Sequence, residues 1–158
     1  MTRDKQPPAF DPMGVAARTG SSYPAPFQAE CATRLKRALG DTADLTRFGV
    51  NLVHLGPGDW SAQRHWHSHE DEFVYVLEGE VTLVTDTGEQ ILTAGMAAGF
   101  PAGVEDGHCL VNRGSAVAAY LVVGDRSFED RVGYPDIDLL AEKHDGTYRF
   151  TNRKGEPT

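Results

Sequence analysis

Three histidines and two glutamates stand close together in residues 64–73, RHWHSHEDEF. His65 and His67 share one side of a β-strand because they are two residues apart, whereas Glu72 is out of phase with them. A turn or bulge between them would reset the alternation and bring Glu72 beside the two imidazoles. Two imidazoles and one carboxylate suit a divalent transition metal ion. The alternative is a polar strand end that is merely rich in histidine.

A fourth ligand is predicted farther along the chain, at His108. This histidine follows a Pro-Ala-Gly turn and opens an apolar run, in which it shares a face with Leu110 and Asn112. Several imidazoles facing one interior would be costly to bury unless they were hydrogen-bonded or bound to metal. The isolated His54 and His144 are expected to be ordinary side chains rather than ligands. The predicted metal ligands are therefore His65, His67, Glu72 and His108.

The elements that must position these residues are short strands. From Phe48 onward, apolar runs alternate with turn residues, and no helical period intervenes. Glycines mark two tight turns, at residues 78–80 and 87–88, which we expect to join antiparallel neighbours. Many short antiparallel strands at this spacing predict a sandwich or a small barrel, either of which can hold a ligand between its walls.

The segments before and after the predicted strands differ from them in composition and periodicity. Residues 1–30 are rich in Pro, Gly and Ser and predict an extended, partly disordered arm. Residues 31–125 form the predicted barrel domain, although residues 31–39 fit a short helix or an edge strand equally well. Residues 126–158 predict an irregular tail that packs on the barrel or on a dimer partner, with a hairpin near residues 152–155.

Composition narrows the classes of function. With 23 acidic and 15 basic residues, the formal net charge is −8, which opposes binding to nucleic acid or to an anionic membrane. No apolar stretch approaches the length of a membrane span, and the first residues lack the apolar region of a secretory signal. Cys31 and Cys109 are too far apart in sequence to indicate a thiolate zinc site. We expect a cytoplasmic protein with reduced, buried cysteines.

The motifs resemble those of the cupin superfamily, in particular its small single-domain bacterial members. The first cupin motif corresponds to His65-x-His67, four residues, Glu72, six residues and Gly79, while Gly58 stands one residue farther from His65 than the pattern requires. The second motif corresponds to the following residues, with two extra residues before the histidine: Gly95, Pro101, Gly103, His108 and Asn112. The resemblance implies an all-β double-stranded β-helix, which is a jelly-roll-like antiparallel barrel.

Two alternatives follow from the motif spacing. The insertion before His108 leaves Asp106 at the nominal position of the third histidine, so Asp106 is a fallback ligand. A register with His67 and His69 as the histidine pair leaves too few residues before Glu72, and the pair His65 and His67 is preferred. His69 then lies at the rim of the site, either as an acid or base in catalysis or simply in solvent.

The resemblance implies one divalent transition metal ion, either Zn, Fe, Mn or Ni, and a small-molecule ligand. Our first hypothesis is a metal-dependent enzyme acting on an oxygen-rich metabolite, in particular an isomerase of a sugar or sugar phosphate. Its predicted catalytic residues are Glu72, as ligand or base, Gln63, which shares the face of the histidines, and His69. The alternatives are a dioxygenase or lyase, or a non-catalytic binding protein with a structural metal. A homodimer is expected, because small cupins commonly form one.

Overall fold

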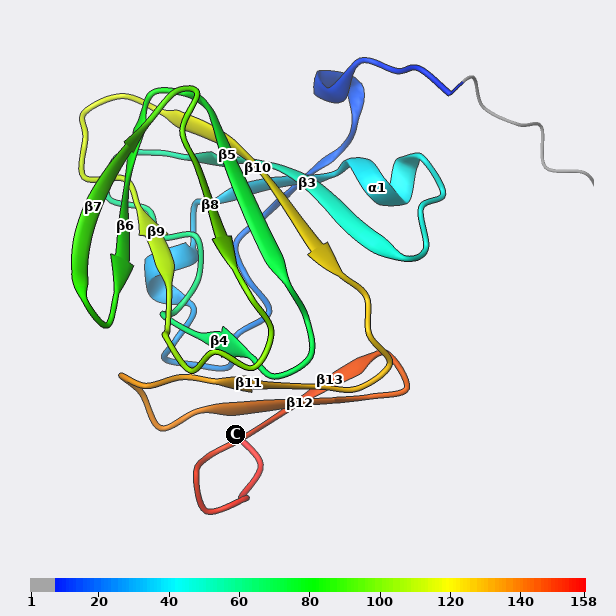
Figure 1. The fold of residues 1–158 in the computed structure, drawn as a ribbon, viewed down its shortest axis with the longest axis vertical. Helices are drawn as coiled ribbons and strands as arrows, with labels where there is room; N and C mark the ends of the chain where they lie inside the picture. Colours follow the sequence, from blue (N-terminus) through cyan, green and yellow to red (C-terminus); the bar gives the residue numbers. More distant parts are fainter. Residues whose placement is uncertain (1–7) are drawn as a thin grey trace, which may run out of the picture.

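Three antiparallel β-sheets build the fold in the computed structural model, which describes residues 8–158. The first residues of the predicted arm, 1–7, lie outside this range. Two of the sheets face each other, and the third lies across one end of the pair (Figure 1). The largest sheet has six strands, in the order β1 (Ala17–Thr19), β2 (Leu35–Ala38), β3 (Phe48–Leu55), β10 (Ala118–Asp125), β5 (Glu72–Glu78) and β8 (Ala97–Phe100).

The two smaller sheets complete the structure. The facing sheet consists of β7 (Gly88–Thr93), β6 (Glu80–Thr85) and β9 (Cys109–Val111). The sheet at the end consists of β13 (Thr147–Thr151), β12 (Leu140–His144), β11 (Asp130–Gly133) and β4 (Trp66–His67). Helical turns are short: η1 (Pro12–Gly14), η2 (Ala29–Cys31) and α1 (Leu39–Thr42).

The main core lies between the two facing sheets. On β5, Val74 and Val76 are buried, whereas their alternate neighbours Phe73 and Tyr75 are exposed, as expected for a strand with one covered face. The same core takes residues from β3, β6, β7, β9 and β10, and is formed by Val53, Leu55, Val74, Val76, Val81, Leu83, Leu92, Leu110, Ala118 and Tyr120. The predicted all-β architecture is therefore confirmed.

Of the two predicted hairpins, one is present and the other is not. β6 and β7 pair through the turn that ends at Gly88, as expected. β5 and β6 do not pair with each other, because the chain passes at Gly79 from the six-stranded sheet to the facing sheet. Gly79 has a φ of 72°, and an added Cβ would lie 3.0 Å from the carbonyl oxygen of Val117. Glycine is needed at this corner for its positive φ and its lack of side chain, not for a hairpin.

The segment predicted as an irregular tail instead contains three strands, β11, β12 and β13. The expected turn near residues 152–155 is present, since the amide of Gly155 donates to the carbonyl of Asn152 and Thr151 bridges to Pro157. The sequence did not indicate these strands, because charged residues interrupt the apolar pattern expected of a strand. Lys143, for example, is buried on β12 beside the apolar row that includes Ala141.

The amino-terminal segment packs against the same end of the molecule. Tyr23 and Phe27 lie against a second core cluster, whose buried members are Val132, Tyr134, Leu139 and Ala141. The stretch 31–39, which fitted a helix or a strand, forms β2 in its centre. β2 lies between β1 and β3. No helix within residues 8–158 is both long and apolar enough to cross a membrane.

Candidate metal centre

The backbone brings the predicted ligands together at the junction of the sheets. His65 and His108 are cross-strand partners, and each donates its amide N–H to the carbonyl of the other, at 3.1 and 2.8 Å. His67 ends β4, and Glu72 begins β5. The four residues between these two strands make the turn that the sequence predicted, and this turn carries Glu72 back to the histidines.

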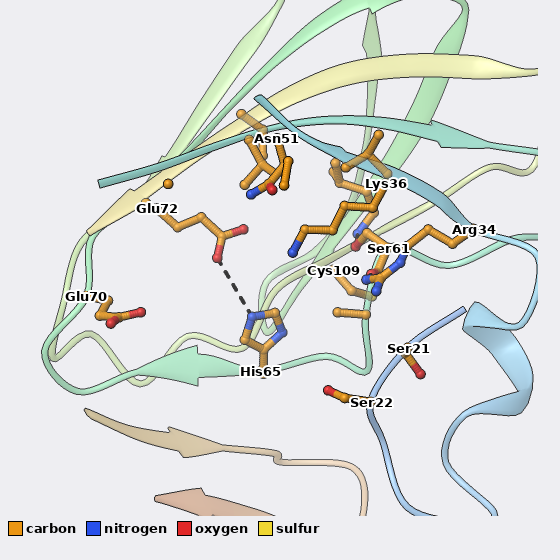
Figure 2. A pocket seen from close by; sticks show the side chains of 18 of the residues that line it. Ser21, Ser22, Arg34, Lys36, Asn51, Ser61, His65, Glu70, Glu72 and Cys109 are labelled. Carbon is orange, nitrogen blue, oxygen red and sulfur yellow. Dashed lines mark hydrogen bonds and ion pairs between the residues drawn. The ribbon is translucent and has the colours of Figure 1, made fainter. Parts of the chain in front are cut away.

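The carboxylate of Glu72 lies among three imidazoles. Its Oε2 is 3.6 Å from Nε2 of His67 and 3.9 Å from Nε2 of His65, and its Oε1 is 3.9 Å from Nε2 of His108. Figure 2 shows His65 and Glu72 facing each other. These distances are too long for good hydrogen bonds. They suit ligands that each lie about 2.0–2.2 Å from one shared metal ion.

Hydrogen bonds fix the orientation of two of the imidazoles. Nδ1 of His65 lies 2.8 Å from the carbonyl oxygen of Gln63, and Nδ1 of His67 lies 2.6 Å from Oδ2 of Asp130. Both partners are acceptors, so each Nδ1 carries the proton and each Nε2 presents its lone pair towards Glu72. This is the arrangement typical of metal-binding histidines.

His108 gives an independent test of whether a metal fits. Both of its ring nitrogens are buried, and neither has a hydrogen-bond partner among residues 8–158. Phe100 stacks on the ring at 3.6 Å between centroids. Burying an imidazole without hydrogen-bond partners costs free energy, and a metal ion bound at Nε2 would provide a partner for that nitrogen. The residues present therefore fit a metal ion.

The ionisation of Glu72 and of His108 agrees with this arrangement. Burial acts to raise the pKa of Glu72, but the imidazoles of His108 and His65 outweigh it and hold that pKa well below its usual range. Burial lowers the pKa of His108 and so favours the neutral ring that a metal requires. Burial acts in the same direction on His67, but Asp130 and Glu72 raise the pKa of this residue above its ordinary value.

Gln63 does not occupy the position that strand alternation predicted. Its amide nitrogen donates to the carbonyl of Phe27 and to the carboxylate of Glu30, both at 2.9 Å, and the side chain is not among those that line the cavity described below. The reason is that β4 contains only Trp66 and His67, so the alternation does not extend back to residue 63. Gln63 secures the amino-terminal segment instead.

Two other candidates also lie apart from Glu72. His69 is exposed, and its Nδ1 is 2.7 Å from Oγ of Ser68. Asp106, the fallback ligand, accepts the amide N–H of Asp86 at 2.8 Å and so secures a loop. Within residues 8–158, neither side chain makes a hydrogen bond or ion pair to the cluster, and the histidine pair preferred from spacing is the pair that the fold places beside Glu72.

Sequence reasoning missed two carboxylates next to the cluster. The side chain of Asp130 is fully buried, and it accepts hydrogen bonds from His67 and from the hydroxyl of Tyr148 at 3.0 Å. Glu70 pairs with the Lys143 ammonium at 2.7 Å. Asp130, Lys143 and Tyr148 lie on β11, β12 and β13, in the segment that was predicted to be an irregular tail. Because no strands were predicted there, strand alternation could not indicate which of these side chains face the cluster.

The cluster opens into a cavity of about 680 Å³ that is lined in part by His65, Glu72 and His108. Cys109 also lines it, and Figure 2 shows this thiol near His65. Burial raises the pKa of Cys109 to about 12, so the thiol stays protonated and is a poor metal ligand. Cys31 is also buried and free, as expected.

Comparison with known proteins settles the family. A model of the cupin domain matches residues 51–124. The solved structure of a sugar phosphate isomerase of the cupin superfamily from Silicibacter pomeroyi DSS-3 is 42% identical, with a TM-score of 0.92 and 96% of each chain covered. The chain belongs to the cupin superfamily. The cupin barrel expected from the two motifs is thus confirmed.

Two further solved structures are similar over most of the chain. A candidate sugar phosphate isomerase from Acidithiobacillus ferrooxidans is 30% identical, with a TM-score of 0.73 and coverage of 80% of this chain and 81% of that one. The polyketide cyclase RemF from Streptomyces resistomycificus is 29% identical, with a TM-score of 0.58 and coverage of 74% and 78%. No curated protein matches this cupin.

The departures from the cupin motifs have structural explanations. Gly58, one residue out of place, has a φ of 85° and donates its amide N–H to the carbonyl of Asn112. Asn112 is fully buried, and its amide nitrogen donates to the carbonyls of Leu55 and Ala116, both at 2.8 Å. These two residues therefore shape the barrel end rather than the metal centre.

Proposed function

We propose that this cupin is a metal-dependent isomerase of a sugar or sugar phosphate, in which His65, His67, Glu72 and His108 hold one Zn, Fe, Mn or Ni ion. The observation that carries the proposal is the convergence of three Nε2 atoms on one carboxylate at 3.6–3.9 Å. Similarity to two solved structures, one described as a sugar phosphate isomerase and one as a candidate sugar phosphate isomerase, supports the choice of reaction. A cytoplasmic location stays a prediction.

Isomerisation of an aldose to a ketose moves a proton between neighbouring carbons. A bound metal ion would polarise the carbonyl or hydroxyl oxygen of the substrate. Glu72 is ionised at neutral pH, so its carboxylate, which would also help to hold the metal, can take up the carbon-bound proton and return it to the neighbouring carbon, while the hydroxyl proton passes to the former carbonyl oxygen. Burial raises the pKa of Tyr120, which lines the same cavity, so its hydroxyl keeps its proton and can donate a hydrogen bond to the substrate.

Metal content and proton exchange test this proposal together. After mild purification, we expect about one equivalent of metal per chain, measured by mass spectrometry, and loss of that metal in His65→Ala and His108→Ala. A panel of aldoses and aldose phosphates would then be incubated in D2O with protein loaded with each of the four metals. Proton NMR should show the ketose product and deuterium at the carbon next to the carbonyl.

His144→Ala is the matched control, because the His144 side chain is 63% exposed and lies outside the cluster. This variant should keep both its metal and its activity. Less than about a tenth of an equivalent of metal, with no gain when metal is added, would refute the metal centre. Full metal loading without turnover or exchange for the whole panel would refute the isomerase and favour a binding protein with a structural metal.

A further inference from the structure

Two cations on the second strand face the cavity that holds the metal cluster. Arg34 directly precedes β2 and Lys36 lies within it, so residues two apart present their side chains on the same face. Both line the cavity together with His65 and Glu72. Figure 2 shows Lys36 and Arg34 on the side of the cavity away from Glu70. The candidate metal ligands and these two cations therefore line the same cavity.

Two of the other cations that line the cavity are paired with carboxylates. Lys143 pairs with Glu70, and Arg126 pairs with Asp41. The side-chain ammonium of Lys36, by contrast, makes no hydrogen bond or ion pair within residues 8–158. Burial, followed by the charge of Arg34, lowers the pKa of Lys36, although the carboxylates of Glu72 and Asp41 act in the opposite direction.

Arg34 is held in place without being neutralised. Its terminal nitrogens donate to the backbone carbonyls of Ser61 and Gly20. Its Nε is buried and has no partner within the part of the chain that the structure describes. The two carbonyls accept hydrogen bonds but carry no net charge, so the positive charge of Arg34 and several of its five N–H donors, including the one on Nε, are left.

We propose that Lys36 and Arg34 form the subsite that binds the phosphate group of the substrate. This inference rests on the proposed isomerase and narrows its substrate class from sugars in general to sugar phosphates. A neutral sugar would leave two partly buried cations uncompensated, whereas a phosphate group provides both charge and acceptor oxygens for them. The cavity of about 680 Å³ has room for a sugar between this subsite and Glu72.

Binding of inorganic phosphate to chelator-treated protein tests the subsite without the metal. Isothermal titration calorimetry should show binding to the wild type, with affinity lower by about tenfold or more in Lys36→Met, since one charge-assisted hydrogen bond is lost. Arg37→Met is the matched control, because Arg37 lies on the same strand but does not line the cavity. Lys36→Arg should retain most of the affinity, and circular dichroism checks that each variant is folded.

The possible results distinguish failure of the proposed phosphate subsite from failure of the proposed isomerase activity. Absence of phosphate binding to the wild type, or equal affinity in Lys36→Met and Arg37→Met, overturns the subsite. Isomerisation of sugars without phosphate, at a rate that Lys36→Met does not change, overturns the subsite but leaves the isomerase in place. Loss of phosphate binding in Lys36→Met with no turnover of any sugar phosphate supports the subsite and refutes the isomerase.

Discussion

Asp130 acts on the metal cluster through His67. Its carboxylate accepts from Nδ1 of His67 at 2.6 Å and from the amide of His69 at 3.0 Å, and its pKa is held low by these contacts although burial opposes them. A carboxylate at Nδ1 makes the opposite nitrogen a stronger ligand and fixes the plane of the ring. Asp130 is therefore a positioning residue for the proposed ligand His67.

We expect Asp130→Asn to lower metal affinity by about 10–100-fold, because an amide still accepts the hydrogen bond but carries no charge. A titration against a fluorescent chelator of known affinity measures the change. Asp138→Asn is the control, since Asp138 is exposed and accepts only the backbone amide of Arg153. Affinities of the two variants that agree within about twofold would show that Asp130 does not tune the site.

Residue types and spacing were enough to predict the cluster but not its surroundings. The pair His65 and His67, the turn before Glu72 and the distant His108 could all be inferred, because each lies in a short, regular motif. Gln63 could not be placed, since its position depends on where β4 begins. Asp130 was missed for a related reason: its contact with His67 joins residues 63 positions apart and follows from tertiary structure alone.

At the scale of elements, β11 determines where β4 lies. Gly133 pairs with Trp66, and Val132 pairs with His67. A Cβ on Gly133 would lie 2.7 Å from Cζ2 of Trp66, so the indole packs directly on the glycine backbone. Gly133 therefore helps to position the strand that carries His67. It belongs to residues 126–158, in which the sequence analysis predicted no regular strands.

Gly133→Ala should destabilise the protein by about 1–3 kcal/mol, because a rigid indole must move away from the new methyl group. Urea unfolding followed by circular dichroism measures this loss. Gly99→Ala is the matched control on β8, where the nearest atom to the added Cβ is 3.9 Å away, and it should change stability by less than about 0.5 kcal/mol. Equal stability of the two variants would contradict the packing role given to Gly133.

At the scale of the whole molecule, an apolar row on the large sheet is exposed to solvent. Phe73, Tyr75 and Leu77 on the outer face of β5 are 40–46% exposed. Exposed apolar rows of this kind are typical of interaction surfaces. Trp66, by contrast, is half-buried and packs against Gly133 of β11. The homodimer stays a prediction, and the outer face of β5 is a better surface for it than Trp66.

The metal centre would also link elements that are far apart in sequence. His67 lies on β4 at the end of the barrel, Glu72 on β5 of the large sheet, and His108 just before β9 of the facing sheet. One ion bound to all of them joins the three sheets directly. Because the unfolded chain cannot gather these ligands, metal binding should add to the free energy of unfolding.

We therefore expect a chelator to lower the melting temperature of the metal-loaded wild type by about 5–10 °C, which corresponds to an ion present at about 100 times its dissociation constant. Differential scanning calorimetry measures the shift. His144→Ala should show the same shift, and His108→Ala should show little or none. An unchanged wild-type melting temperature would contradict the linkage. The chelator shift is compared within each variant, because His108→Ala also opens a cavity beside Phe100 that lowers stability with or without metal.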